Sequence, residues 1–276
     1  MTAGRISARF LDGARGRILV VARLPAASDR GRAALVVPPF AEEMNKSRRM
    51  ITELAERLAA LGVATVVPDL FGTGDSEGEF CDGDWDVWKQ DVSRAAVWSA
   101  NEGWPVFAVL ATRLGCALAA ETSRDLLDRV ERTVFWAPAL DGARFLTQFL
   151  RLRVAASMMA DGRGETVGGL RERLRHGETL EVAGYALSPS LADRIDGLRL
   201  VERLGPHVGE LHWMEVLRTA DLPMPDASVA AIMAAEPGVG AIRRHIVAGE
   251  PFWSATEIVL NADLVDRTVA ALTGES

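Results

Sequence analysis

The chain has 276 residues, of which 49% are hydrophobic and 25% charged, a composition that excludes a disordered or fibrous protein. Its 31 basic and 38 acidic residues give a formal net charge of −7, which does not favour binding to nucleic acid. Only two cysteines are present, Cys81 and Cys116, too few for a disulfide framework, so we expect a reducing compartment.

The sequence carries no signal for a membrane. No apolar run reaches the length that a transmembrane helix needs. Residues 1–15 contain Arg5, Arg9, Asp12 and Arg15 and no apolar block, so a secretory signal is not expected. We therefore expect a cytoplasmic protein without a membrane span.

Short apolar runs alternate with helical patterns along most of the chain. Residues 6–11 and 17–24 predict an antiparallel hairpin, because Asp12-Gly13 and Gly16 lie between them. Further strands are predicted at residues 33–37, 63–67, 106–111, 133–136, 211–217 and 242–248. Helices are predicted at residues 46–61, 85–100, 117–128, 227–236 and 261–272. This alternation indicates an α/β fold with a mostly parallel eight-stranded sheet flanked by helices.

One segment breaks the alternation between strands and helices. It contains helical patterns at residues 145–160, 167–175 and 191–204, and a single short strand pattern at 180–183. An insertion of this length between two strands of an α/β sheet is typical of a cap over the ligand crevice. We therefore predict an α/β core formed by residues 1–140 and 210–276, with residues 141–209 as a helical cap inserted in it.

The turn after the strand at 106–111 has the pattern of a nucleophile elbow. Such an elbow requires small residues around a strained turn, as in G-x-S-x-G. Here Ala111-Thr112-Arg113-Leu114-Gly115 keeps the small flanking residues, but Arg113 occupies the nucleophile position. Arginine stays protonated at neutral pH and cannot act as a nucleophile.

Several stretches of the sequence match a known family. They are residues 37–48 (VPPFAEEMNKSR), 69–76 (DLFGTGDS), 113–115 (RLG), 181–185 (EVAGY) and 251–253 (PFW). In these stretches the chain resembles the α/β-hydrolases and, within them, the exosortase A system-associated hydrolase 2 family. The resemblance implies a bacterial protein linked to exopolysaccharide production and to the sorting of tagged exported proteins. It implies a hydrolase of the ester or acyl type by similarity of fold, and an arginine at the elbow is in keeping with that group.

The two remaining positions of a catalytic triad can be placed on the predicted strands. In α/β-hydrolases the acid comes before the histidine in chain order. Asp221 stands where the acid would be, with Asp226 and Glu215 as less natural choices. The loop after the last predicted strand has Pro251 at the position of the histidine, and the four histidines of the chain all lie elsewhere. Because nucleophile and base are both missing, the sequence does not support ordinary serine-hydrolase chemistry.

Two roles remain open for the residues around the elbow. Cys116 could be a displaced nucleophile at a helix N-terminus, although a small buried cysteine more often serves in packing. Arg113 could hold a phosphate or carboxylate beside the helix N-terminus. Alternatively, it could be neutralised by Glu42, Glu43 or Glu257, and we place this internal ion pair ahead of ligand binding.

We predict no metal and no cofactor, because the sequence has no His-x-x-x-His or Asp-x-Asp spacing. The residues expected to line the pocket are Phe40, Glu42, Glu43, Asn45, Arg113, Leu114, Trp253 and Glu257. Two functions follow as hypotheses. One is a hydrolase-family enzyme that acts on an ester or acyl substrate through a non-standard site. The other is a non-catalytic protein whose crevice binds a small acidic ligand or a protein partner.

Overall fold

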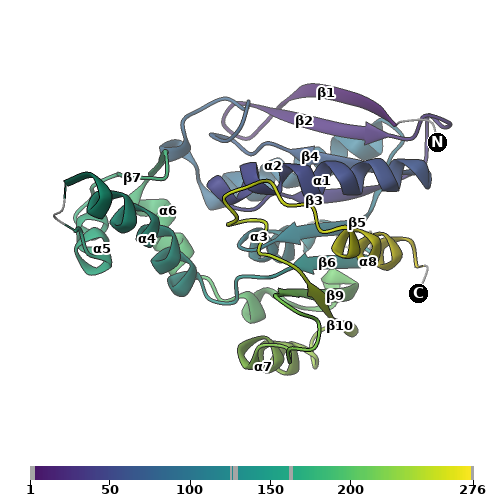
Figure 1. Cartoon of the computed structure of the whole chain (residues 1–276). Coiled ribbons are helices and arrows are strands. Elements are labelled where there is room, and N and C mark those ends of the chain that lie inside the picture. Colours follow the sequence, from purple (N-terminus) through teal and green to yellow (C-terminus); the bar gives the residue numbers. More distant parts are fainter. Residues whose placement is uncertain (1–3, 125, 127–129, 162–163, 275–276) are drawn as a thin grey trace.

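The computed structural model describes residues 4–124, 126, 130–161 and 164–274, and its sheet has eight strands in the order β1-β2-β4-β3-β5-β6-β9-β10. The pairs β1–β2 and β2–β4 are antiparallel, and the other neighbours are parallel. The mostly parallel eight-stranded sheet is therefore confirmed (Figure 1). The strands are β1 Arg5–Asp12, β2 Arg17–Leu24, β3 Arg32–Val37, β4 Val63–Pro68, β5 Val106–Thr112, β6 Arg132–Trp136, β9 Glu210–Leu217 and β10 Ala241–Ala248.

Helices cover both faces of the sheet, which is why the central strands are apolar on both sides. Met50, Leu54 and Leu58 of α1 join Leu264 of α8 in the hydrophobic cluster on one face. Helices α2, α3 and α7 contribute to the cluster on the other face. These helices are α1 Glu42–Ala60, α2 Trp85–Asn101, α3 Gly115–Ser123, α7 Asp226–Ala235 and α8 Ala262–Thr273.

Several helix boundaries differ from the predictions, most clearly those of α1, α3 and α6. Helix α1 begins at Glu42 and not at residue 46, because its two acidic residues suit the positive end of the helix dipole. Helix α3 ends at Ser123, whereas the prediction extended it to residue 128; residues 125 and 127–129 lie outside the described part of the chain. The predicted helix 191–204 is instead α6, Pro189–Asp196, followed by a 3-10 helix at Leu200–Arg203, because Gly197 ends α6.

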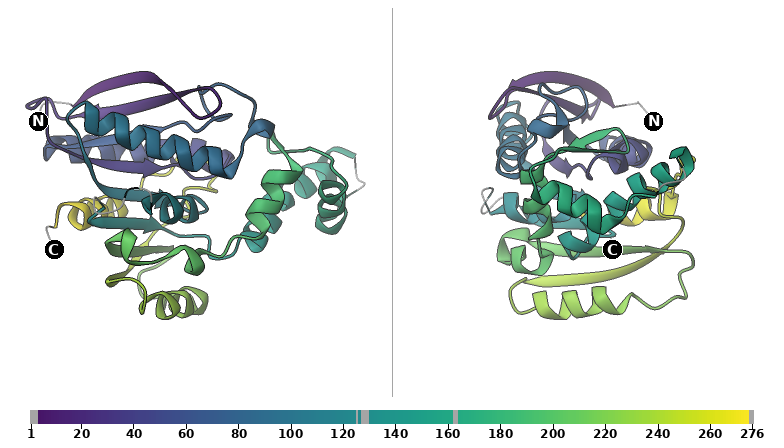
Figure 2. Two further views of the ribbon diagram at one scale, coloured as in Figure 1. Left: turned by 180° about the vertical axis from the view of Figure 1, so that it is seen from behind. Right: turned by 90° about the vertical axis from the view of Figure 1, so that its left-hand side faces the viewer.

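The segment between β6 and β9 contains α4 Gly142–Asp161, α5 Val167–Arg175 and α6. It also contains a hairpin of β7 Leu180–Val182 and β8 Tyr185–Leu187, of which only the first strand was predicted. Ala183 and Gly184 form the turn with positive φ at both positions, so the turn was mistaken for the end of an isolated strand. Figures 1 and 2 show that these helices extend beyond one end of the sheet, on the side away from both chain ends.

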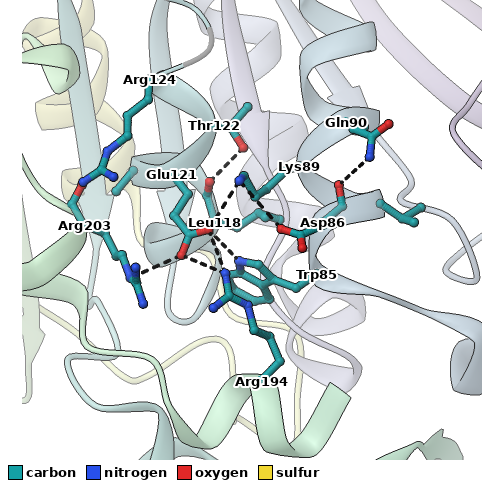
Figure 3. Close-up of polar contacts among 12 residues, drawn as sticks. Trp85, Asp86, Lys89, Gln90, Leu118, Glu121, Thr122, Arg124, Arg194 and Arg203 are labelled. Carbon is teal, nitrogen blue, oxygen red and sulfur yellow. Dashed lines mark hydrogen bonds and ion pairs between the residues drawn. The ribbon is translucent and has the colours of Figure 1, made fainter. Parts of the chain in front are cut away.

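A buried carboxylate joins this inserted segment to the core (Figure 3). Glu121 of α3 accepts a hydrogen bond from Trp85 Nε1 at 3.1 Å and one from Arg194 of α6 at 3.2 Å. Lys89 Nζ at 3.7 Å and Arg203 Nε at 3.3 Å complete the ion pairs around it. Because these cations come from α2, α6 and the 3-10 helix, one acidic side chain holds three separate elements together.

Candidate functional site

The elbow predicted from the sequence is present as a sharp turn between β5 and α3. Arg113 has a φ of 55°, in the left-handed region that L-residues seldom adopt, and its amide donates to the Trp136 carbonyl of β6 at 3.0 Å. A Cβ atom at Gly115 would lie 2.5 Å from the Pro38 carbonyl oxygen, so this position needs glycine. The strained turn and the small flanking residue are those that a nucleophile elbow requires.

The Arg113 side chain points from the elbow toward the end of β6 and toward α4. Its Nε donates to Glu43 Oε1 at 3.2 Å, Nη1 to the Ala137 carbonyl at 3.1 Å, and Nη2 to Gln148 Oε1 at 3.5 Å. The guanidinium also lies 5.1 Å from the ring centre of Trp253. An arginine has five N–H donors, so two of them have no partner among the described residues, and 17% of the side chain is exposed.

Glu43, in the first turn of α1, is the acidic partner of Arg113. Burial raises the pKa of Glu43 to about 7, although the Arg113 guanidinium acts in the opposite direction. Its second oxygen, Oε2, is buried without a hydrogen-bond partner. Near neutral pH, Glu43 is therefore only partly ionised, and it does not fully neutralise Arg113.

The predicted acid position lies away from the elbow. Asp221 is exposed in the loop after β9, and the Thr219 hydroxyl lowers the pKa of its carboxyl. Asp226 begins α7. Of the three candidate acids, Glu215 of β9 lines a cavity together with Arg113. It accepts hydrogen bonds from Trp213 Nε1 at 2.9 Å and from Ser228 Oγ at 2.6 Å.

The loop after β10 has Pro251 at the position predicted for the histidine. Pro251 is exposed, and its carbonyl accepts from the Ser254 amide in a turn. His212 and His245 stack on each other in β9 and β10, with ring centres 5.3 Å apart. The other two histidines bond to the main-chain carbonyls of Ala120 and Glu172. Within the described ranges, no group of three or more histidine, cysteine or acidic residues could hold a metal ion.

Cys116 lies in the first turn of α3, pointing into the core. The side chain is fully buried, and this burial raises the pKa of its thiol well above the ordinary value. A buried neutral thiol is a poor nucleophile, so the environment of Cys116 favours the packing role over the catalytic one.

Two cavities flank the elbow, and the predicted pocket residues divide between them. The apolar cavity, of about 50 Å³, is lined by Phe40, Asn45 and Leu114 together with Tyr185. The arginine cavity, of about 220 Å³, lies on the other side and is lined by Arg113, Trp253, Glu215, Ser228, Arg144 and Gln148. A volume of 50 Å³ holds only a few waters, so the arginine cavity has more room for a ligand.

The other predicted pocket residues lie at or beyond the edge of these cavities. Glu43 contacts Arg113 but is itself buried, and Glu42 is half-buried beside it. Glu257 is exposed in the loop after Trp253, and in the described residues it makes no ion pair with Arg113. Arg144 and Gln148 were missed, because the helical pattern was predicted to begin only at residue 145. In the structure α4 begins at Gly142, and the four-residue spacing places both side chains on one face of the helix.

Comparisons with known proteins identify solved structures that share this fold. No protein-family model matches the sequence, and no curated protein matches it. Est1E from Butyrivibrio proteoclasticus with bound ferulic acid is similar with a TM-score of 0.69 at 15% identity, over 97% of this chain and 98% of that chain. The alpha/beta hydrolase GrgF from Penicillium sp. sh18 has a TM-score of 0.62 at 18% identity, over 98% of both chains. XC6422 from Xanthomonas campestris, an a/b serine hydrolase without lid, has a TM-score of 0.56 at 14% identity, over 100% of this chain and 97% of that chain.

These similarities extend over almost the whole chain and confirm the α/β-hydrolase fold. Identities of 14–18% establish the fold alone. As for membranes, none of the helices in the described residues combines the length and the apolar character that crossing a bilayer would require.

Proposed function

We propose that this α/β-hydrolase-fold protein binds a small acidic ligand in the arginine cavity and has no ordinary serine-hydrolase activity. The observation that carries the proposal is the placement of Arg113, a permanent cation with two N–H donors left over, on the elbow itself. A guanidinium with open donors at a cavity wall is suited to a carboxylate or phosphate group.

The partial charge of Glu43 strengthens this proposal. With a pKa of about 7, Glu43 loses much of its negative charge as the pH falls below neutral. Arg113 then keeps a net positive charge for a ligand, so anion binding should become tighter between pH 8 and pH 6. The ring of Trp253 beside the guanidinium adds an apolar surface for the body of the ligand.

Hydrolysis through a triad would need groups that this site does not offer. Arg113 cannot attack a carbonyl carbon, and Pro251 supplies no base. We also propose, from the motif resemblance, that the protein works in the cytoplasm within an exosortase-linked exopolysaccharide system and that residues 141–209 serve as a cap. The cap assignment is supported by Asn45, whose side chain donates to Tyr185 Oη of the inserted segment at 3.0 Å.

Three measurements test this function. The purified protein should not react with a fluorophosphonate probe and should not hydrolyse p-nitrophenyl acetate or butyrate. In isothermal titration calorimetry, benzoate should bind and benzamide should not, and Arg113→Gln should abolish benzoate binding. Arg9→Gln, which removes an exposed arginine from β1, should leave binding unchanged.

Opposite results would favour the other hypothesis, a hydrolase with a non-standard site. Ester turnover that is lost in Arg113→Ala or Cys116→Ala but kept in Arg9→Gln would overturn the non-catalytic proposal. Equal binding of benzoate to the wild type and to Arg113→Gln would overturn the assignment of Arg113 as the anion-binding group.

A further inference from the structure

The arginine cavity continues toward the surface along helix α4. A third cavity of about 460 Å³, which we call the outer cavity, is lined by Arg144, Thr147, Gln148, Arg151 and Arg171 and by Asp141. Asp141, Arg144 and Gln148 line both cavities, so the two adjoin along this helix. Arg144, Gln148 and Arg151 are spaced four and three residues apart, which places them on one side of α4.

The outer cavity has positive charge that no acidic side chain balances. Arg144 and Arg151 are both exposed, and neither side chain makes a hydrogen bond or an ion pair within the described parts of the chain. The third cation, Arg171, is different, because it pairs with Asp196 and also donates to the Ala143 carbonyl at 2.7 Å.

The acidic side chains of the two cavities are engaged elsewhere. Asp141 pairs with Arg199 Nε at 3.3 Å, and Glu215 accepts from Ser228 and Trp213. Of these two acids, only Glu215 has no cationic partner, because both of its hydrogen-bond donors are neutral. Glu215 lines the arginine cavity. Negative charge on a ligand is therefore favoured at Arg113 and along α4, and disfavoured next to Glu215.

We propose that the natural ligand is elongated and carries two anionic groups. One binds Arg113 in the inner cavity, and the other binds Arg144 and Arg151 in the outer cavity. This inference rests on the proposed function, since it takes Arg113 as the first anion-binding group. At a rise of 1.5 Å per residue, Arg144 and Arg151 begin about 10 Å apart along α4, and their long side chains can reach a common group between them.

The experiment compares acids of equal length with one and with two carboxylates. Octanoate and suberate are titrated into the full chain by isothermal titration calorimetry at low salt. We expect suberate to bind at least about fivefold more tightly than octanoate, the gain that one well-placed exposed ion pair can give. This difference should shrink when the ionic strength is raised to 0.5 M, because exposed charges are screened.

Variants assign the gain to the arginines of α4. Arg144→Gln and Arg151→Gln should each reduce suberate affinity about threefold and leave octanoate affinity unchanged. Arg9→Gln is the matched control for the loss of one surface charge and should change neither the suberate affinity nor the octanoate affinity. All these side chains are exposed, so the variants should unfold at the temperature of the wild type, which a thermal melt verifies.

The outcomes separate the two proposals. If octanoate binds through Arg113 but suberate binds no more tightly, the two-anion inference is wrong and the proposed function stands. A preference for suberate that survives in both Arg144→Gln and Arg151→Gln also overturns the inference. If neither acid binds but benzoate does, the two-anion inference is wrong and the proposed function stands; if benzoate also fails to bind, both proposals are wrong.

Discussion

Replacing Glu121 by glutamine should destabilise the protein by about 3 kcal/mol. Its carboxylate is only 6% exposed and faces Lys89, Arg194 and Arg203, whose side chains are 25–38% exposed. Removing one member of a buried ion pair costs about 3–5 kcal/mol, and we take the lower end because the cations keep contact with water. Glutamine keeps the size of the side chain and an acceptor for Trp85 Nε1, so the change isolates the charge.

The assay is equilibrium unfolding in urea, followed by tryptophan fluorescence and by circular dichroism. Glu56→Gln is the matched control, because Glu56 is 49% exposed and pairs with Arg23 at 3.2 Å. We expect Glu56→Gln to lower the free energy of unfolding by less than about 1 kcal/mol. In the Glu121→Gln variant, a second substitution of Arg194→Gln should restore part of the stability by removing one unbalanced cation. A loss of stability equal to that of Glu56→Gln would refute the reasoning.

The remaining predictions concern titration and thiol chemistry. Because burial raises the pKa of Glu43 to about 7, the native state holds a proton that the unfolded chain releases as the pH rises. This proton should lower the free energy of unfolding by about 3 kcal/mol between pH 4.5 and pH 7.5 relative to a Glu43→Gln variant, and urea titrations of the two proteins measure that difference. His212 changes the free energy of unfolding with pH in the opposite direction, because burial lowers its pKa to about 4. The free energy of unfolding should fall by about 2 kcal/mol as the pH drops from 6.5 to 4. A His212→Gln variant with the same pH dependence as the wild type would contradict this prediction. In the folded protein, Ellman's reagent should modify Cys81, which is half-buried, much faster than the fully buried Cys116, and equal rates would show that the core around α3 opens readily.

The fold could be predicted from the sequence because its signals are local. Apolar runs such as 33–37 lie between helical patterns, and each is short enough to be a strand of a parallel sheet. The elbow could be placed for the same reason, since Ala111 and Gly115 lie beside Arg113 in the chain. The hairpin at residues 180–187 was predicted only in part, because Ala183 shows no turn preference until its positive φ is seen.

The surroundings of Arg113 could not be predicted in the same way. Its partners Glu43 and Gln148 lie 70 and 35 residues away in the sequence. Glu43 was one of three acids proposed as the partner, and the sequence offered no means to prefer it over Glu42 or Glu257. Gln148 comes from the inserted segment, which packs against the core through contacts between residues far apart in the sequence, such as those of Glu121 with Arg194 and of Phe40 with Phe149.

The ion pair between Arg113 and Glu43 restricts how this protein could change by mutation. A single substitution of Arg113→Ser would leave the Glu43 carboxylate buried without its cation and would still lack a histidine at residue 251. That variant would lose stability and gain no hydrolysis. Substituting histidine for Pro251 first would leave Arg113, which cannot give up a proton, at the elbow. A laboratory effort to create a serine hydrolase on this scaffold should therefore change residues 43, 113 and 251 together, because selection for activity has no single-step path to follow.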